Sequence, residues 1–94
     1  MIDLSVVLPA CNEESNLPAM VRRVGLTLDA LALTGEIIVV DDGSTDATAA
    51  VAAALPVRLL CHADNRGYGA ALRTGFEAAL GRRVFFTDAD QQFD

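Results

Sequence analysis

Four short apolar segments alternate along the chain with three longer segments. The short segments are rich in β-branched or aromatic side chains, and they cover residues 4–10, 36–42, 57–62 and 83–88. Apolar residues follow one another in these segments instead of alternating with polar ones, which is typical of strands covered on both faces. The pattern therefore predicts four buried strands.

The three longer segments are predicted to be helices, because their apolar residues recur at spacings of three and four or because alanine dominates them. They cover residues 13–33, 45–55 and 67–81. Ser44 and Thr45 are candidate N-caps of the second helix, and Pro56 ends it. Gly81 is the candidate C-cap of the third helix.

Strands and helices thus alternate from the first strand to the fourth. Right-handed crossovers then favour a parallel sheet with helices on both faces, a three-layer Rossmann-like α/β fold in a single domain over residues 1–94. Ligands of such sheets bind beyond the carboxyl ends of the strands. Polar loops follow all four strands, as "PACNEE", "DDGSTD", "HADNRGYG" and "DADQQFD".

Composition narrows the possible partners. Hydrophobic residues make up 52% of the chain and charged residues 21%, which is typical of a packed domain. Thirteen acidic and seven basic residues give a net charge of -6, which excludes bulk attraction to nucleic acid or to an anionic membrane. An anionic phosphate ligand would need a metal ion or a local basic group.

The cellular compartment is predicted from the cysteines and from the start of the chain. Cys11 and Cys61 are far apart and are predicted to be free thiols in a reducing compartment. The first residues include Asp3 and only a short apolar run, unlike a signal peptide or a membrane span. A cytoplasmic location is expected.

The sharpest chemical signal is the pair Asp88 and Asp90, directly after the fourth predicted strand. Where a strand ends and the chain turns, two such carboxylates can converge on one cation. Mg²⁺ or Mn²⁺ would need few further oxygens, and the amide of Gln92 is a candidate. The alternative is a solvated acidic loop.

Asp41 and Asp42 end the second predicted strand, and Gly43 and Ser44 follow as a turn. Turn formation and a ligand contact both remain possible for Asp41. Asp42 is the better candidate to accept hydrogen bonds from a nucleobase or ribose. His62 is predicted to be a solvated or capping residue of the next loop.

Gly67, Tyr68 and Gly69 begin a partial G-x-G-x-x-G motif, in which Leu72 replaces the third glycine. A dinucleotide-binding fingerprint is therefore disfavoured. The glycines are instead interpreted as allowing a helix N-terminus to pack closely against the ligand loops. Arg66 and Arg73 are candidates for diphosphate binding, with solvated side chains as the alternative.

The segments "VVLPACNEE", "IIVVDDGSTD", "NRGYGAALRTGF" and "FFTDADQQFD", in this order, resemble the nucleotide-sugar-binding half of family 2 glycosyltransferases with the GT-A fold. The resemblance covers essentially the whole chain. It is closest to the branch of dolichyl-phosphate mannose synthase and bacterial polyprenyl-phosphate glycosyltransferases. It implies a GT-A sheet that stops after its fourth strand, before the acceptor half.

The resemblance implies a nucleotide pocket made by two loops. Pro9, Cys11 and Glu13 would line the base and ribose. Val40 and Asp42 would contact the base. Cys11 stands where the family often has an aromatic residue.

The resemblance also implies a metal site. Asp88 and Asp90, with Gln92, would bind Mg²⁺ or Mn²⁺ against the donor diphosphate, and the backbone of Ala89 would contact the nucleotide sugar.

The function implied is transfer of a sugar from UDP- or GDP-sugar to an acceptor, with polyprenyl phosphate expected, at the membrane surface in a longer parent protein. No catalytic base is assigned, so it stays open whether this chain is itself an enzyme. The alternative is a non-catalytic module that binds nucleotide or associates with itself. An exposed fourth strand predicts a homo-oligomer of the isolated chain.

Overall fold

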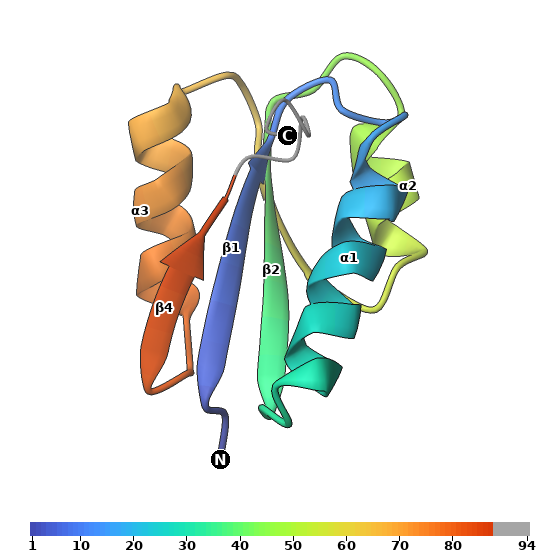
Figure 1. The fold of residues 1–94 in the computed structure, drawn as a ribbon. Helices are drawn as coiled ribbons and strands as arrows, with labels where there is room; N and C mark the ends of the chain where they lie inside the picture. Colours follow the sequence, from blue (N-terminus) through green and yellow to red (C-terminus); the bar gives the residue numbers. More distant parts are fainter. Residues whose placement is uncertain (88–94) are drawn as a thin grey trace.

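The residues that the computed structural model describes form one sheet of four parallel strands, with three helices distributed over its two faces (Figure 1). The structure describes residues 1–87. The strands are β1 (Leu4–Ala10), β2 (Gly35–Asp42), β3 (Arg58–His62) and β4 (Arg83–Phe86). The helices are α1 (Leu17–Ala30), α2 (Thr48–Ala53) and α3 (Tyr68–Ala78). The predicted three-layer, parallel α/β fold is confirmed.

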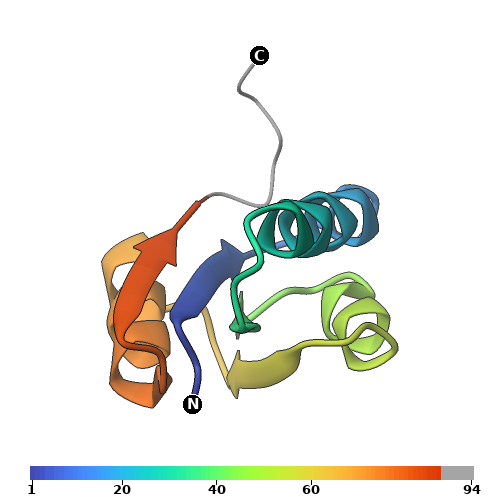
Figure 2. The same cartoon turned by 60° about the horizontal axis from the view of Figure 1, so that its bottom comes forward.

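The strand order in the sheet is β3-β2-β1-β4, and every neighbouring pair is parallel. The chain therefore moves outward from β1 to β3 and then returns to the other side of β1. Figure 2 shows α3, the returning helix, on the opposite face of the sheet from α1 and α2. The order of the strands thus reverses between β1 and β4, and such a switch point opens a ligand crevice at the carboxyl ends of the strands.

Each face of the sheet carries its own apolar core. On the α1 and α2 face, the strands contribute Val6, Leu8, Ala10, Ile37 and Val39. On the α3 face, Val7, Ile38 and Val40 pack with Ala71. Alternate residues of β1 and β2 thus point to opposite faces and are buried on both, as expected for interior strands.

The predicted ends of the helices are partly wrong. Ser44 and Thr45 do not cap α2, which begins at Thr48 and has no side-chain cap. Hydrogen bonds to neighbouring loops occupy both residues instead. Gly81 is not the C-cap of α3, because this helix ends at Ala78. The Gly81 N–H donates to the hydroxyl of Ser5 on β1, at 2.8 Å.

A second prediction about glycine is also wrong. Apart from the adjacent residues and the helix's own backbone, no atom lies within 4 Å of where a Cβ of Gly67 or Gly69 would stand, so these residues do not provide close packing. The closely packed glycine of α3 is Gly75, where an added Cβ would lie 2.3 Å from Cγ1 of Val7. The residue that allows α3 to approach the sheet therefore lies in the middle of the helix.

A charged cluster fixes the end of the sheet opposite the loops described below. The carboxylate of Glu36 accepts hydrogen bonds from Ser5 Oγ at 2.6 Å, Arg58 Nη1 at 2.6 Å and the N–H of Leu80 at 2.7 Å. Burial by itself would raise the pKa of Glu36, but these hydrogen bonds and the charge of Arg58 lower it overall. The cluster ties β1, β2 and β3 to the segment that enters β4.

Strand β4 was predicted to be buried on both faces, and within the described residues this is wrong. Val84, Phe85 and Phe86 are 42%, 57% and 45% exposed. Phe86 gains one edge-to-face contact with Phe76 of α3, at 6.0 Å between ring centres. The other side of β4 has no neighbouring strand in the described part of the chain.

Candidate functional site

Three loops gather at the carboxyl edge of the sheet, and β4 runs toward the same edge but ends opposite Val7, before the end of β1 (Figure 1). The loops are residues 11–16 after β1, 43–47 after β2 and 63–67 after β3. Because all four strands are parallel, each loop leaves the same edge of the sheet. The polar segments that follow β1, β2 and β3 therefore share one edge, and the fourth, residues 88–94, lies outside the described residues.

Asn12 joins the first loop to the second. Its side-chain oxygen accepts hydrogen bonds from the N–H groups of Thr45 at 2.8 Å and Asp46 at 3.3 Å. Its own N–H donates to the hydroxyl of Ser44 at 2.9 Å. Asn12 has a φ of 56°, in the left-handed region that asparagine tolerates better than most residues. This residue was not among those singled out in the sequence.

Asp41 holds the turn after β2. Its carboxylate is buried and accepts hydrogen bonds from the N–H of Ser44 at 3.3 Å and from the Ser44 hydroxyl. Between them, Gly43 has a φ of 69°. A Cβ on Gly43 would lie 2.4 Å from the backbone of Asp64 and Asn65. Of the two roles left open for Asp41, the turn role is observed, and Gly43 lets the second and third loops touch.

Asp42 is held in a buried polar cluster. Its two oxygens accept the N–H groups of Arg66 and Gly67, both at 2.9 Å, and one oxygen lies 2.8 Å from Nδ1 of His62. The other ring nitrogen of His62, Nε2, lies 2.8 Å from the hydroxyl of Thr74 on α3. The prediction of a solvated or capping His62 is wrong, since this side chain is buried between β2 and α3.

The cluster keeps Asp42 ionised. Burial would raise the pKa of Asp42, but the two backbone donors and His62 lower it overall. Because an ionised carboxylate only accepts hydrogen bonds, Nδ1 of His62 carries the proton in this pair. A carboxylate has about four accepting positions, of which three are occupied here. Within residues 1–87 no fourth hydrogen bond to Asp42 is observed, and its side chain is 6% exposed.

The other predicted pocket residues lie at or below the same edge. Pro9 is buried near the end of β1. Cys11 is half-buried, and its sulfur lies 3.3 Å from the side-chain nitrogen of Asn65. Glu13 is half-buried, and its N–H donates to the hydroxyl of Thr48 at 2.9 Å. Val40 is fully buried in the core, so its side chain has a packing role, and its contact with a base stays a prediction.

The predicted metal ligands Asp88, Asp90 and Gln92, and the neighbouring Ala89, lie outside the described residues. The N–H of Thr87 donates to the carbonyl of Val7 at 3.1 Å. The described chain therefore ends beside β1, at the switch point of the sheet. Within residues 1–87, no three His, Cys, Asp or Glu side chains gather closely enough to hold a metal ion.

Arg73, one of the two predicted basic groups for a diphosphate, is exposed. Arg66, the other, is also exposed and pairs with Asp64 at 3.3 Å. Its backbone N–H, through the bond to Asp42, is the part of this residue that belongs to the buried cluster. No helix within residues 1–87 is long and apolar enough to cross a membrane.

The family is shown by the sequence. A model of glycosyl transferase family 2 matches residues 5–94, and the chain belongs to this family. The resemblance inferred from the four loop segments is therefore confirmed.

Among the relatives, a dolichyl-phosphate beta-glucosyltransferase of Drosophila melanogaster is 43% identical in an alignment of 101 positions. The alignment covers 95% of this chain and 31% of that protein. An undecaprenyl-phosphate 4-deoxy-4-formamido-L-arabinose transferase of Aeromonas hydrophila is 43% identical in an alignment of 98 positions. This alignment covers 95% of this chain and 29% of that protein. The chain spans about a third of the length of these relatives.

Solved structures agree with the fold. Mannosyl-3-phosphoglycerate synthase from Rubrobacter xylanophilus superposes with a TM-score of 0.85 at 26% identity, over 99% of this chain and 32% of that one. Glucosyl-3-phosphoglycerate synthase from Mycobacterium tuberculosis, solved with Mn²⁺, UDP and glucosyl-3-phosphoglycerate, has a TM-score of 0.78 at 32% identity. That match covers 94% of this chain and 33% of the other. The predicted GT-A type of fold is confirmed.

Proposed function

We propose that this chain forms the donor-binding part of a metal-dependent glycosyltransferase that takes a sugar from a UDP-sugar. The observation that carries the proposal is the meeting of the 11–16, 43–47 and 63–67 loops at the carboxyl edge of a family 2 sheet, toward which β4 also runs. The glucosyl-3-phosphoglycerate synthase of Mycobacterium tuberculosis was solved with UDP and Mn²⁺ together, which supports this donor and metal class. GDP-sugar is the second candidate donor.

Asp42 is the proposed contact to the nucleobase. Its remaining accepting position would take the ring N–H that uracil and guanine both carry and that cytosine and adenine lack. His62 and the N–H groups of Arg66 and Gly67 hold the carboxylate in place beforehand. Pro9, Cys11 and Glu13 are proposed to line the rest of the nucleotide pocket, with Val40 beneath it in the core.

The metal site is proposed at Asp88 and Asp90, with Gln92 as a further ligand and Ala89 as a backbone contact to the nucleotide sugar. Two carboxylates and an amide oxygen are the hard donors that Mg²⁺ and Mn²⁺ prefer. A cation bound there would neutralise diphosphate charge and stabilise the charge that develops on the leaving nucleoside diphosphate. It would also allow a chain with a net charge of -6 to bind an anionic donor.

Polyprenyl phosphate is the proposed acceptor, at the cytoplasmic surface of a membrane. The names of the relatives, which refer to dolichyl phosphate and undecaprenyl phosphate, support this choice. No residue of this chain is assigned as the catalytic base. The isolated chain is also proposed to self-associate through β4.

Isothermal titration of the chain with UDP, UDP-glucose and GDP, with and without Mn²⁺, tests the proposal. Mn²⁺ is expected to tighten UDP binding at least tenfold, and Asp88→Asn or Asp90→Asn is expected to remove most of that gain. Asp29→Asn, an exposed change on α1, is the matched control and should keep the gain. UDP binding that is equally strong without metal, in wild type and variants alike, would contradict the metal site.

A turnover assay on the same samples distinguishes an enzyme from a binding module. It measures consumption of UDP-glucose with and without a polyprenyl phosphate. Donor binding without turnover would identify a binding module. Acceptor-dependent release of UDP would identify an enzyme.

A further inference from the structure

Two neighbouring strands place a polar pair beneath α3. Asp42 and His62 are the last residues of β2 and β3, and the register of the strands sets them side by side. Val40 and Leu60, two residues earlier on the same strands, pack in the core on the α3 face. Because side chains two residues apart along a strand share a face, Asp42 and His62 point toward α3 as well.

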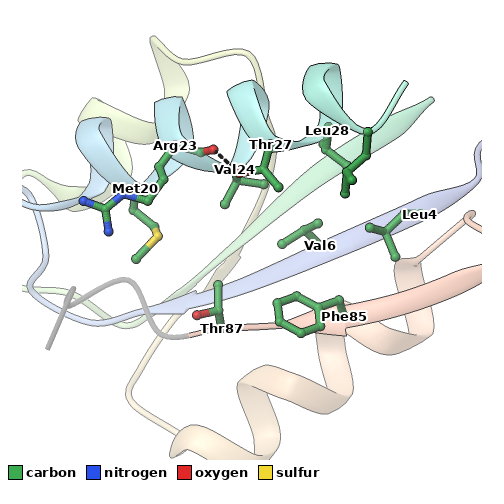
Figure 3. Close-up of a pocket in the computed structure, with 10 residues that line it drawn as sticks. Leu4, Val6, Met20, Arg23, Val24, Thr27, Leu28, Phe85 and Thr87 are labelled. Carbon is green, nitrogen blue, oxygen red and sulfur yellow. Dashed lines mark hydrogen bonds between the residues drawn. The ribbon is translucent and has the colours of Figure 1, made fainter. Parts of the chain in front are cut away.

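Helix α3 supplies a third polar side chain, that of Thr74. This residue lies next to Gly75, where α3 packs closely against the sheet. Its hydroxyl lies 2.8 Å from Nε2 of His62. A helical threonine can donate its hydroxyl to the carbonyl four residues earlier, as Thr27 of α1 does to Arg23 at 2.9 Å (Figure 3). Thr74 instead uses its hydroxyl between the helix and the sheet.

The three side chains form one chain of hydrogen bonds. An ionised Asp42 only accepts, so Nδ1 of His62 donates to it, at 2.8 Å. The hydroxyl of Thr74 can donate to Nε2 of a neutral ring or accept from Nε2 of a charged one. In both cases it occupies the second ring nitrogen, and no buried side-chain nitrogen or oxygen within residues 1–87 is left without a partner. Thr74 therefore holds the ring in the orientation that directs the Nδ1 proton at Asp42.

Loss of the Thr74 hydroxyl would leave Nε2 without a partner in a His62 that is only 8% exposed. An unpaired polar atom at a buried position is costly, so the ring is expected to turn until Nε2 reaches water. The turn would take one donor away from Asp42. The carboxylate would then be free to take up a proton, and a protonated carboxyl group donates a hydrogen bond as well as accepting one.

We propose that Thr74, acting through His62, is a positioning residue that determines which nucleobases the donor site accepts. The inference rests on the proposed contact between Asp42 and the base. A carboxylate that only accepts suits the ring N–H of uracil or guanine, whereas the corresponding ring nitrogen of cytosine carries no hydrogen. A carboxyl group that also donates would suit both kinds of base.

Binding of UDP and of CDP to the chain, with Mn²⁺ present in both titrations, tests this role. The two nucleotides share the ribose and the diphosphate, so the ratio of their dissociation constants reports on the base alone. Wild type is expected to bind UDP at least about fivefold more tightly than CDP, because cytosine gives the carboxylate no ring N–H. Thr74→Val, which keeps the shape of the side chain and removes the hydroxyl, should lower this preference to less than about twofold. Thr74→Ser should restore it.

Thr27→Val is the matched control. It removes the hydroxyl of a threonine that also lies in a helix but bonds only to the backbone of its own helix, on the opposite face of the sheet from α3. The preference for UDP over CDP should stay as in wild type.

NMR of the histidine ring gives a second readout, which needs no ligand. His62 is the single histidine of the chain, so its ring signals identify themselves. The proton on Nδ1 should exchange slowly with water in wild type and Thr74→Ser, and rapidly in Thr74→Val. Slow exchange of the amide of Val39, which is fully buried in β2, shows that the chain as a whole has stayed folded. Thr74→Ala takes the place of Thr74→Val if that variant does not fold.

The possible failures are distinguishable. A preference for UDP that Thr74→Val leaves unchanged, or that Thr74→Ser does not restore, would overturn the role of Thr74 and leave the donor site standing. Equal binding of UDP and CDP by wild type would do the same. A wild-type His62 without a proton on Nδ1 would contradict the hydrogen-bond chain, whichever variants fold. Failure of wild type to bind either nucleotide would overturn the proposed donor site, and this inference with it.

Discussion

At the residue scale, Asp42 and His62 form the centre of the candidate site. The two side chains connect the end of β2, the end of β3, the 63–67 loop and, through Thr74, helix α3. His62 would therefore hold the Asp42 carboxylate in position for a contact with a nucleobase, without itself having to touch the ligand. This makes His62 a positioning residue of the proposed donor site.

A double-mutant cycle of Asp42→Asn and His62→Ala tests this pair. Each single change is expected to cost roughly 1 to 3 kcal/mol of unfolding free energy, because a buried partner loses its hydrogen bond. The double variant should lose less than the sum of the two, by at least about 0.5 kcal/mol. Denaturant unfolding measures all four proteins, and additive losses would show that the two residues act independently.

Asp64→Asn is the control for the cycle. Asp64 lies in the same loop, but its side chain is 79% exposed and pairs only with Arg66 in the described part of the chain. Its replacement is expected to change stability by less than about 1 kcal/mol. His62→Ala should also weaken UDP binding, which Asp64→Asn should not do.

Glu36 leads to a prediction of pH dependence. Its pKa is lower in the folded chain than its ordinary value of 4.5, so its contribution to stability is present above about pH 4.5 and is lost as the pH falls through the folded value. The stability difference between wild type and Glu36→Gln should therefore be roughly 1 to 3 kcal/mol at neutral pH and shrink below about pH 4.5. Denaturant unfolding across this range measures it.

Glu77→Gln, an exposed change on α3, is the control for the pH series. Its difference from wild type should stay within about 0.5 kcal/mol, as expected of an ordinary surface change. A Glu36→Gln difference that stays constant down to about pH 3 would contradict the lowered pKa of Glu36.

Individual contacts were the part of the site that the sequence predicted least well. The polar loops after β1, β2 and β3 were correctly placed at one edge of the sheet, because parallel strands bring their carboxyl ends together. His62 was nevertheless predicted to be solvated, since its partner Asp42 is 20 residues away. The register of β2 and β3 sets Asp42 directly opposite His62, so matching the two strand ends would have revealed the pair.

At the element scale, α3 depends on one close contact with the sheet. Gly75 faces Val7, which is fully buried in β1 and has a stiff, β-branched side chain. Gly75→Ala is expected to destabilise the chain by about 1 to 3 kcal/mol, because overpacking outweighs the better helix propensity of alanine. Thermal or denaturant unfolding checks the sign.

Gly69→Ala is the matched control in the same helix. Nothing lies within 4 Å of the Cβ that it would add, so only the gain in helix propensity, of up to about 1 kcal/mol, should remain. If Gly75→Ala were as stabilising as Gly69→Ala, the close approach of α3 to β1 would be wrong.

The elements themselves were predicted well, and their ends less well. The predicted range of β1, residues 4–10, coincides with the observed strand, because its largely apolar run lies between Asp3 and the polar segment that begins at Asn12. The start of α2 was missed because Ser44 bonds to Asp41 and Thr45 to Asn12 in preference to capping a helix. The bond between Thr45 and Asn12 connects loops that are 33 residues apart, which periodicity does not reveal.

At the scale of the whole molecule, the described chain has one well-covered side and one uncovered side. Strands β1 and β2 are buried between helices, whereas β4 is exposed on both faces and along its outer edge. The isolated chain is therefore expected to self-associate weakly, with an average mass in sedimentation equilibrium that rises with concentration. Phe85→Glu should reduce this rise and Leu26→Glu should not. A monomer at high concentration would contradict the expectation.

Above all, we propose that the carboxyl edge of the sheet binds a nucleoside diphosphate together with a divalent metal ion. Titration of the ¹⁵N-labelled chain with UDP and Mg²⁺, followed by NMR, tests this residue by residue. We expect shifts of the amide signals in the 11–16, 43–47 and 63–67 loops and in residues 88–92. The amides of Glu36, Leu80 and Gly81, at the opposite edge of the sheet, should not shift. Shifts confined to that opposite edge, or no shifts at saturating UDP and Mg²⁺, would contradict the proposed donor site.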